Sequence, residues 1–302
     1  MKVTKASNIA FCPGVDKIIK YIYQCRKGAY LLNSPVHNDI VSNKLIEDGY
    51  RIIDTNTLLK CQEITVITQA HGITRIEELI IERNNIHQVD MTCPIIKNIY
   101  KHIKENKGPK IAIFGNVNDR EVQVITNKFP YVLVLKDKSD LINLKEPYIF
   151  LFQSTYPLDK YEEITSYIDN NMVDSKYVDT ICPFVRSRFE EAINISSDLI
   201  LVLSDKKSAN GNNLFSVCKK NNPNSTCFLI SNMDELKELD LNNYKEATIL
   251  SATSTPLSFV DEVYNYLLSV WFVKSKFNFI LTKFANYFAN FFFFAIILFI
   301  IK

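Results

Sequence analysis

Glycine is scarce in this sequence, with only 7 glycines among 302 residues. A loop that wraps phosphate groups with backbone N–H groups needs several glycines at fixed spacing. Neither a P-loop nor a dinucleotide-binding fingerprint is present, which argues against those classes of nucleotide-binding protein. A phosphate site in this chain would therefore have to use side chains and helix N-termini instead.

The chain also lacks an excess of charge of either sign. Its 35 basic and 33 acidic side chains give a formal net charge of +2, and no long basic run occurs. Nothing in this balance indicates nucleic-acid binding. With 47% hydrophobic and 23% charged residues, the composition is typical of an ordinary folded protein.

The N-terminal segment has no targeting pattern. It lacks the apolar stretch of a secretory signal and the Arg- and Ser-rich character of an organelle leader. We therefore expect a cytoplasmic, reducing location, where the seven cysteines act as thiols or metal ligands and not as disulfides.

One apolar segment lies near the end of the sequence. Residues 284–301 carry no charge and are flanked by Lys283 and Lys302, which reaches the lower limit for a membrane-spanning helix. Its strongly apolar part, Phe291–Ile301, is too short to span a bilayer alone. Two interpretations of the apolar tail (269–302) stay open, a membrane tether and an extension without function.

Short β-rich runs alternate with amphipathic stretches along the rest of the chain. This alternation indicates an α/β fold with mostly parallel sheets. The expected strands are 30–32, 51–53, 63–68, 110–114, 131–135, 148–153, 199–203, 226–230 and 247–251, with a further one at the N-terminus. The expected helices are 15–25, 38–48, 75–84, 94–105, 120–128, 158–170, 183–196, 212–220, 233–239 and 256–268.

Three cysteines, Cys12, Cys93 and Cys182, are each followed by proline and then by a helix-like pattern. Proline suits the first position of a helix, so each cysteine should be an N-cap. At an N-cap, the helix dipole and the free N–H groups favour a thiolate. A single buried cysteine is most simply a small apolar residue, but the shared Cys-Pro context favours a common role.

The even spacing of these three pairs predicts three related structural units. Val-Asp-Met-Thr-Cys-Pro at 89–94 also resembles Val-Asp-Thr-Ile-Cys-Pro at 178–183. We expect a domain spanning residues 1–268, built from three pseudo-repeated α/β lobes that each contribute one cysteine to a centre at their junction. Their approximate limits are 12–95 for the first lobe, 96–185 for the second, and 186–268 with the N-terminal strand for the third.

Three thiol ligands fit two kinds of metal centre. A zinc site would need a fourth ligand, whereas an iron–sulfur cube with three cysteines leaves one iron open to substrate. From the residues alone, both remain possible interpretations.

Polar loops follow several of the expected strands, where parallel α/β sheets usually bind ligands. His37 and His71 follow the strands at 30–32 and 63–68, whereas His87 and His102 lie in polar, helix-like surroundings typical of surface residues. The loops also include residues 115–121, 153–155, 208–212 and 251–256. Each alone is most simply a helix cap, but together they suggest a site for an anionic ligand.

At this level of detail the chain resembles the 4-hydroxy-3-methylbut-2-enyl diphosphate reductase (LytB) family. Nine short motifs carry the resemblance in the family's order. They are Phe-Cys-x-Gly-Val at 11–15, Val-His-Asn at 36–38, Ala-His-Gly at 70–72, Asp-x-Thr-Cys-Pro at 90–94, Glu-Val at 121–122, Gln-Ser-Thr at 153–155, Thr-Ile-Cys at 180–182, Ser-x-Asn at 208–210 and Ser-Thr-Pro at 254–256.

The resemblance implies an iron–sulfur oxidoreductase of the non-mevalonate isoprenoid pathway. Such an enzyme reductively removes the substrate hydroxyl as water, giving isopentenyl and dimethylallyl diphosphates, with electrons from a ferredoxin or flavodoxin. It also implies a central [4Fe–4S] cluster, catalytic acid–base groups and a diphosphate site. By position, Cys12, Cys93 and Cys182 would hold the cluster, Glu121 and Thr155 would be catalytic, and His37, His71, Ser208, Asn210 and Ser254 would bind the diphosphate.

Two substrate-facing positions depart from the family pattern. Asp119 stands where the family has a histidine, and Ala209 where it usually has a serine. A carboxylate beside a diphosphate is repulsive unless it is protonated, turned away or paired. Arg120 is adjacent and could supply the lost positive charge, although neighbouring residues seldom point the same way. We expect weakened substrate binding with the chemistry retained.

Two further interpretations stay open. One is a degenerate relative that keeps the cluster without turnover. The other is a three-cysteine metal protein with a structural or redox-sensing role.

Overall fold

A computed structural model describes most of the chain, namely residues 2–25, 28–36, 38–106, 110–145 and 147–270. His37 and residues 271–302 lie outside the described part. The predictions made for His37 and for the apolar tail therefore remain predictions. Among the described residues, no helix is both long and apolar enough to cross a bilayer.

Three sheets of four parallel strands each form the framework of the described chain. The first has the order β3 (Arg51–Ile53), β2 (Tyr30–Leu32), β4 (Thr65–Ile67) and β5 (His87–Val89). The second has the order β7 (Leu133–Leu135), β6 (Lys110–Phe114), β8 (Tyr148–Phe152) and β9 (Lys176–Tyr177). The third has the order β1 (Lys2–Lys5), β12 (Glu246–Ser251), β10 (Leu199–Leu203) and β11 (Thr226–Ile230).

Helices alternate with these strands, as parallel pairing requires. They are α1 (Pro13–Gln24), α2 (Asp39–Glu47), α3 (Thr55–Leu58), α4 (Arg75–Arg83), α5 (Pro94–Glu105), α6 (Arg120–Lys128), η1 (Lys138–Asn143), α7 (Leu158–Asn171), α8 (Pro183–Ile193), α9 (Ala209–Asn221) and α10 (Met233–Lys237). Residues 257–270 are also helical. The predicted α/β class with parallel sheets is confirmed.

Four short elements were not predicted from the sequence. They are the strands β5 and β9, the one-turn helix α3 and the 3₁₀ helix η1. The helix-like surroundings expected for His87 were wrong, because this exposed residue belongs to β5 and pairs with Thr65 of β4. These segments carry no long apolar run, so their sequences gave no periodic signal.

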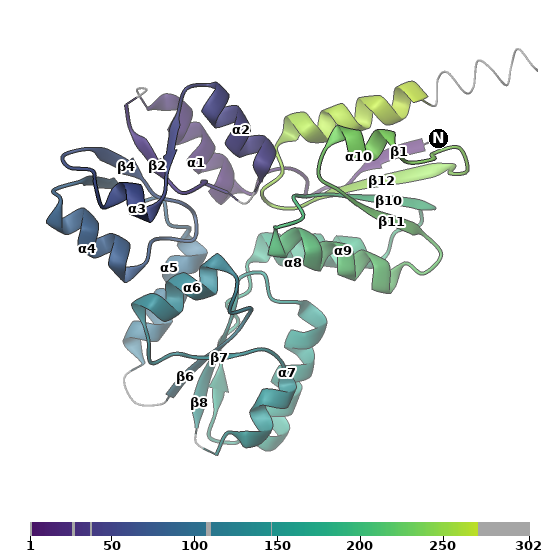
Figure 1. The fold of residues 1–302 in the computed structure, drawn as a ribbon. Helices are drawn as coiled ribbons and strands as arrows, with labels where there is room; N and C mark the ends of the chain where they lie inside the picture. Colours follow the sequence, from purple (N-terminus) through teal and green to yellow (C-terminus); the bar gives the residue numbers. More distant parts are fainter. Residues whose placement is uncertain (1, 26–27, 37, 107–109, 146, 271–302) are drawn as a thin grey trace, which may run out of the picture.

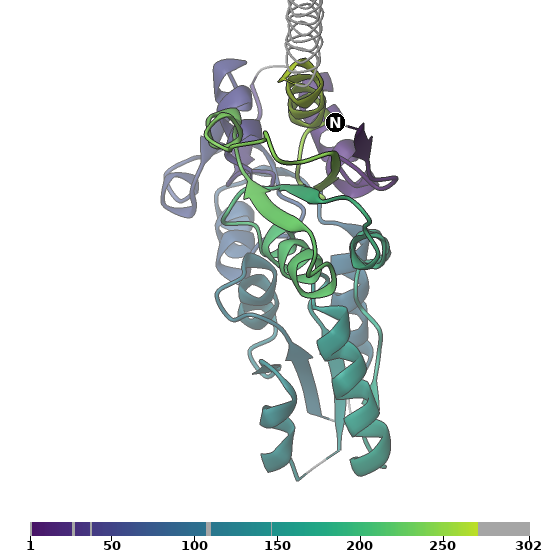
Figure 2. The same cartoon turned by 90° about the vertical axis from the view of Figure 1, so that its right-hand side faces the viewer.

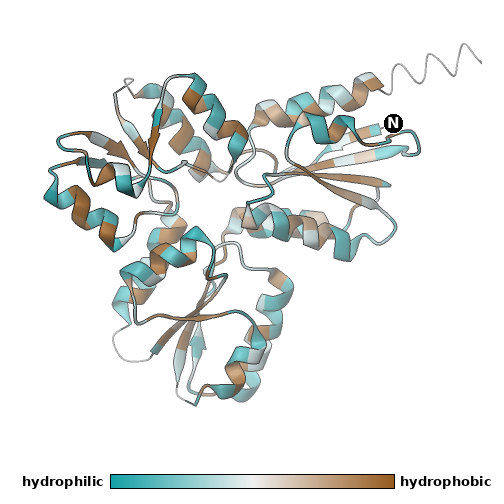
Figure 3. Ribbon diagram, in the orientation of Figure 1, coloured by the Kyte–Doolittle hydropathy of each residue, from teal (hydrophilic) through white to brown (hydrophobic). Residues whose placement is uncertain are grey.

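The cores lie on both faces of each sheet, as strand β10 illustrates. All five of its residues are buried. On one face Ile200 packs with Phe189 of α8, and on the other Leu201 packs with Phe259 of the helix at 257–270. Strands buried on both faces read as continuous apolar runs, which is why this strand was predicted correctly. Figure 3 shows this apolar colouring along the central strands.

Figure 1 shows the three sheets, each with its helices, arranged around a common centre. Figure 2 shows that the sheet containing β6 and β8 extends to the end of the molecule opposite the helix at 257–270. Each predicted lobe contains one sheet, and we propose that the expected lobe limits hold. The N-terminal strand completes the third sheet through its pairing with β12, and Lys5 Nζ lies 2.5 Å from Asp261 Oδ1.

Candidate active site at the junction of the three sheets

The three Cys-Pro pairs start helices α1, α5 and α8. Cys12, Cys93 and Cys182 are each the N-cap residue, with proline in the first turn, as predicted. The Sγ atom of Cys12 accepts a hydrogen bond from the backbone N–H of Val15 at 3.5 Å. The other two side chains make no capping hydrogen bond of this kind.

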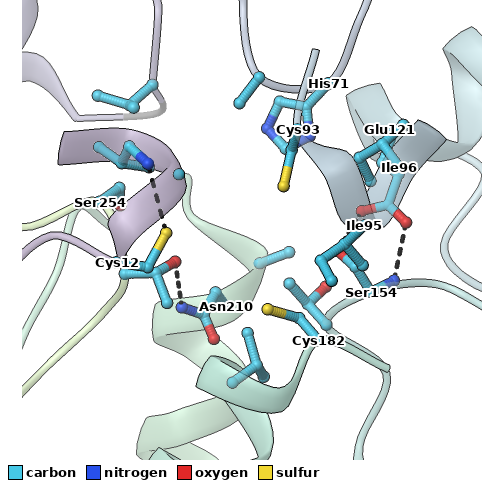
Figure 4. Close-up of a pocket in the computed structure, with 18 of the residues that line it drawn as sticks. Cys12, His71, Cys93, Ile95, Ile96, Glu121, Ser154, Cys182, Asn210 and Ser254 are labelled. Atoms are coloured by element: carbon cyan, nitrogen blue, oxygen red, sulfur yellow. Dashed lines mark hydrogen bonds between the residues drawn. The ribbon is translucent and has the colours of Figure 1, made fainter. Parts of the chain in front are cut away.

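The three thiols line one cavity, although their helices belong to three different lobes. Figure 4 shows the three sulfur atoms around the same space. A Cβ atom placed on Gly14 would lie 3.6 Å from the Sγ of Cys93 and 3.8 Å from that of Cys12. The two sulfur atoms therefore lie beside the same small region. The fold therefore brings together residues that are far apart in the sequence.

The donor set suits a polynuclear cluster better than a single ion. Among the described residues, no group of three or more His, Cys, Asp or Glu side chains converges tightly enough to hold one metal ion. A zinc ion needs three or four protein ligand atoms about 2.0 to 2.3 Å from one point, whereas thiols that bind a cube are spread around its corners. Three thiols around a cavity of about 110 Å³ fit the second arrangement.

The protonation of the thiols differs from the sequence-based prediction. Burial raises the pKa of Cys93, and the backbone N–H groups of Ile95 and Ile96 lower it by less. Burial likewise outweighs the helix N-terminus at Cys182. The helix N-termini act in the predicted direction at these two positions, but burial has the larger effect and the pKa of both thiols is raised. A bound metal would displace the protons, because only the thiolate is a ligand.

Glu121 in the first turn of α6 is the buried acid of the site. It is 1% exposed, and its carboxylate accepts hydrogen bonds from Ser154 N–H at 2.7 Å and from Ser154 Oγ at 2.5 Å. Burial raises the pKa of Glu121 to about 7, the bonds from Ser154 lower it, and the charge of Asp119 raises it. A carboxylic acid with such a pKa can donate a proton near neutral pH.

The loop after β8 contributes two residues with different roles. Thr155, the residue that the family resemblance placed beside Glu121, lines the cavity and accepts a hydrogen bond from Gln153 Nε2 at 3.1 Å. The direct partner of Glu121 is Ser154, which the sequence reasoning had not singled out (Figure 4). Its place in the Gln-Ser-Thr motif, at the carboxyl end of a strand, was the available signal.

Polar groups of the third lobe face the cavity opposite Glu121. Ser208 caps α9 through its bond from Gly211 N–H at 3.3 Å, and Asn210 Nδ2 donates to Thr253 Oγ1 at 2.8 Å. Asn210 Oδ1 and Ser254 Oγ are buried and have no hydrogen-bond partner among the described residues. Buried polar atoms without partners are rare in folded proteins, and binding of a ligand, water or ion is one way in which they are satisfied.

His71 lies on the first-lobe side of the same cavity. Its backbone carbonyl accepts a hydrogen bond from the Tyr100 hydroxyl at 3.1 Å, and Gly72 follows it with a positive φ of 80°. A Cβ at Gly72 would lie 2.7 Å from that hydroxyl, so this turn requires glycine. The turn fixes the histidine at the end of β4.

Asp119 and Ala209, the two departures from the family pattern, both line the cavity. Asp119 Oδ1 accepts a hydrogen bond from Glu121 N–H at 2.9 Å, which caps α6. Both residues also line a neighbouring cavity of about 810 Å³ that contains three lysines, Lys136, Lys160 and Lys207. The two substituted positions thus lie in the wall shared by the two cavities.

Arg120 does not replace the lost positive charge in the cavity. Its Nη2 atom lies 2.9 Å from both carboxylate oxygens of Glu77 in α4, and it is not among the residues that line the site. The interpretation that Arg120 compensates for Asp119 is therefore wrong. Adjacent residues at a helix start point in different directions, and the buried Glu77 fixes the guanidinium.

Fold and site together define a class of protein: an α/β enzyme in which three cysteines, a buried carboxyl and polar side chains line one central cavity. The family model described as LytB protein matches residues 3–268. The chain therefore belongs to the LytB family of reductases, as the sequence motifs indicated.

Curated relatives extend over most of the chain. A 4-hydroxy-3-methylbut-2-enyl diphosphate reductase from Bacteroides fragilis is 31% identical over 280 residues, covering 87% of this chain and 96% of the relative. One from Thermotoga neapolitana is 30% identical over 274 residues, covering 87% and 93%.

Two solved structures share the fold. The E-1-hydroxy-2-methyl-but-2-enyl-4-diphosphate reductase from Plasmodium falciparum matches with a TM-score of 0.77 and 24% identity, covering 88% of this chain and 87% of the other. A second structure, titled as (E)-4-hydroxy-3-methyl-but-2-enyl diphosphate reductase, matches with a TM-score of 0.63 and 22% identity, covering 89% and 100%. At these identities the comparison supports the three-sheet architecture alone.

Proposed function

We propose that this chain reductively dehydroxylates 4-hydroxy-3-methylbut-2-enyl diphosphate. The C–O bond of the substrate breaks, two electrons and two protons are consumed, and the hydroxyl leaves as water. The products would be isopentenyl and dimethylallyl diphosphates, as in the last step of the non-mevalonate pathway. The observation that carries this proposal is the meeting of three thiols and the buried Glu121 around one cavity.

Cys12, Cys93 and Cys182 would hold a [4Fe–4S] cluster in this cavity. When bound, such a cluster supplies an electron source and a Lewis acid at its fourth iron. Three apolar side chains next to the cysteines, Val15, Ile95 and Ile96, line the same cavity. They limit the access of water to the reacting groups.

Glu121 would deliver the proton to the substrate. Its pKa of about 7 keeps a large fraction of the carboxyl protonated at neutral pH. The two hydrogen bonds from Ser154 hold the carboxyl in one orientation, so the proton is presented at a fixed place in the cavity. Thr155 in the same wall would assist this transfer.

The diphosphate would bind on the third-lobe side. Ser208, Asn210 and Ser254 offer hydroxyl and amide donors there, and His71 adds a donor from the first lobe. His37 would join them. Because Asp119 and Ala209 offer no donor to an anion, we expect substrate affinity to be reduced more than the rate of the chemical step.

Anaerobic purification with iron and acid-labile sulfide analysis tests the cofactor. The parent chain and the C61S control should carry iron and sulfide, whereas C93S should lose most of both. Cys61 is suitable as a control because it is not among the residues that line the cavity. Zinc, or no metal, in the parent would instead support a structural or redox-sensing role.

Substrate-dependent oxidation of a reduced artificial donor tests the reaction. The loaded parent should oxidise the donor only when the diphosphate is added. A chain that carries the cluster without this oxidation would be a degenerate relative. The physiological donor would be a ferredoxin or flavodoxin.

We further propose a cytoplasmic location, with residues 284–301 as a possible tether to a membrane surface. Fractionation of cells that express the full chain, compared with one ending at residue 270, tests the tether. Recovery of both entirely in the soluble fraction would rule the tether out.

A further inference from the structure

A buried arginine joins helix α8 to the chain segment before Cys12. Arg188 belongs to the second turn of α8, the helix that Cys182 caps, and is only 3% exposed. Its side chain is not among those that line the cavity. Arginine is almost never this deeply buried unless it is paired.

The hydrogen bonding of Arg188 is incomplete. Nη2 donates to the backbone carbonyl of Ala10 at 2.6 Å. Nε and Nη1 are buried and have no partner among the described residues, and no carboxylate lies within ion-pair distance in the described part of the chain. A buried charge without a counter-ion is strongly unfavourable. The site is therefore incomplete without a negative group.

The groups around Arg188 identify that negative group. Burial lowers the pKa of the guanidinium, whereas the charges of Cys12, Cys182 and Glu191 act in the opposite direction. The carboxylate of Glu191 already accepts hydrogen bonds from the N–H groups of Ser7 and Asn8. Arg188 belongs to the helix that Cys182 caps, and it binds the backbone carbonyl two residues before Cys12, so these two cysteines are the nearby groups that become anions when they bind a metal.

The bond to Ala10 also bears on the position of Cys12. Ala10 has a positive φ of 63°, which is unfavourable for a residue with a side chain. Its N–H donates to Ser251 Oγ at 2.7 Å, and Cys12 N–H donates to the carbonyl of Thr253 at 3.1 Å. The remaining backbone polar group of Ala10 is its carbonyl, which accepts the hydrogen bond from Arg188 Nη2.

We propose that Arg188 is a positioning and charge-compensating residue of the three-cysteine site. It holds the Ala10–Cys12 segment in place, and its buried positive charge faces the thiolates of Cys12 and Cys182 when they bind an anionic iron–sulfur cluster. This inference rests on the proposed function. A positive charge beside a cluster stabilises the reduced form more than the oxidised form, so Arg188 raises the reduction potential.

Three variants separate charge from packing. R188Q removes the charge and keeps an amide donor, and R188K keeps the charge. R186Q is the matched control, because Arg186 lies on the same helix, is partly exposed and pairs with Asp179 at 2.6 Å. Each anaerobically purified holoprotein is analysed for iron and sulfide, and its midpoint potential is followed by redox titration with electron paramagnetic resonance.

The expected result is a more negative potential for R188Q. At the midpoint potential of the parent, its ratio of reduced to oxidised cluster should fall at least about tenfold, equivalent to about 59 mV for a one-electron couple. R188K and R186Q should stay near the parent. A parent that carries the cluster, together with an R188Q potential equal to that of R186Q, overturns this inference and leaves the proposed function intact.

If R188Q loses the cluster, its potential cannot be measured, and R188K then tests whether the charge or the shape of arginine matters. A charge role requires that R188K keep the cluster at a potential near that of the parent. Loss of the cluster in R188K to the same extent means that only the shape of arginine matters, which overturns the charge role. A parent chain without iron overturns both this inference and the proposed function.

Discussion

Arg120 Nη2 lies 2.9 Å from both carboxylate oxygens of Glu77, and this ion pair joins α6 of the second lobe to α4 of the first. Glu77 also accepts a hydrogen bond from Thr55 Oγ1 at 2.8 Å and one from Thr74 N–H at 2.7 Å. Burial would raise its pKa, but these bonds and the charge of Arg120 outweigh burial, and the pKa lies below its usual value. The pair therefore holds the start of α6, where Glu121 lies.

The first prediction is that E77Q weakens the contact between α4 and α6. The substitution leaves the partly buried guanidinium of Arg120 without a counter-ion. We expect a loss of about 2 kcal/mol or more in the free energy of unfolding, measured with denaturant. The matched control is E82Q on the same helix, whose exposed carboxylate lies 3.9 Å from Arg75 and should contribute little. Equal stability of the two variants would contradict the role given to this pair.

The second prediction concerns the carboxylate in the substrate cavity. D119H replaces a negative group with a hydrogen-bond donor, so KM for the diphosphate substrate should fall by about fivefold, the value of one hydrogen bond of about 1 kcal/mol. N118H is the control, because Asn118 lines the neighbouring cavity but not the one with the cysteines. If D119H had the KM of the parent, Asp119 would not be the cause of weakened binding.

The third prediction is a loss of activity at alkaline pH. Because the pKa of Glu121 is about 7, its proton is available below that pH and is lost above it. The single-turnover rate at saturating substrate should fall about tenfold per pH unit above pH 7, if this proton transfer limits the rate. Its measurement over pH 6 to 9 checks the prediction.

Two variants should shift the pH above which the single-turnover rate falls, and they should shift it in opposite directions. S154A removes a hydrogen bond that lowers the pKa of Glu121, so the limit should shift to higher pH. D119N removes a charge that raises this pKa, so the limit should shift to lower pH. Shifts in the same direction for both variants would mean that another group controls the profile.

The fourth prediction uses the same carboxyl to link stability to pH. Its pKa rises from an ordinary value of 4.5 to about 7 on folding, so the native state binds more protons between these values. The stabilisation from this proton is fully present below pH 4.5 and is lost as pH rises through 7, about 3 kcal/mol in all. Relative to E121Q, the parent should therefore lose stability across this window in urea unfolding measured at several pH values.

The sequence predicted the framework of the fold where local patterns were strong. Strand β10 reads as five consecutive apolar residues, and helix α5 follows a Cys-Pro start with an amphipathic repeat. The strands β5 and β9 were missed because His87-Gln88-Val89 and Lys176-Tyr177 are short and polar. Such strands form because a neighbouring strand offers hydrogen bonds, and no local pattern reports that.

The site was predictable to the extent that its residues carry local motifs. The Cys-Pro pairs and the loops after the strands fall on recognisable helix starts, so their meeting could be predicted. The pairs Ser154–Glu121 and Arg188–Ala10 join residues far apart in the chain, and no spacing rule connects them. Arg120 could be doubted as a replacement charge from sequence alone, because adjacent residues seldom point the same way, but its actual partner Glu77 lies far from it in the chain and could not be predicted.

The fifth prediction concerns the close approach of α9 to the end of β10. A Cβ atom added to Gly211 would lie 1.8 Å from Ser204 Oγ and 2.3 Å from Ser204 Cβ, so G211A must displace the helix. We expect a loss of about 2 kcal/mol in unfolding free energy. KM for the diphosphate should also rise, because Ser208 and Asn210 begin this helix.

A compensating change separates this clash from a general effect of alanine. Without the clash, alanine would favour the helix by about 0.5 to 1 kcal/mol. The double variant S204G/G211A removes the two Ser204 atoms with which the new Cβ would clash and leaves only Ala252 Cβ, at an ordinary contact distance of 3.6 Å, so it should recover most of the stability and the KM lost in G211A. G28A serves as the control, because a Cβ there meets nothing within 4 Å and should change neither quantity. A double variant no better than G211A would show that the contact with Ser204 does not set the position of α9, since relief of that contact is the only gain the second substitution offers.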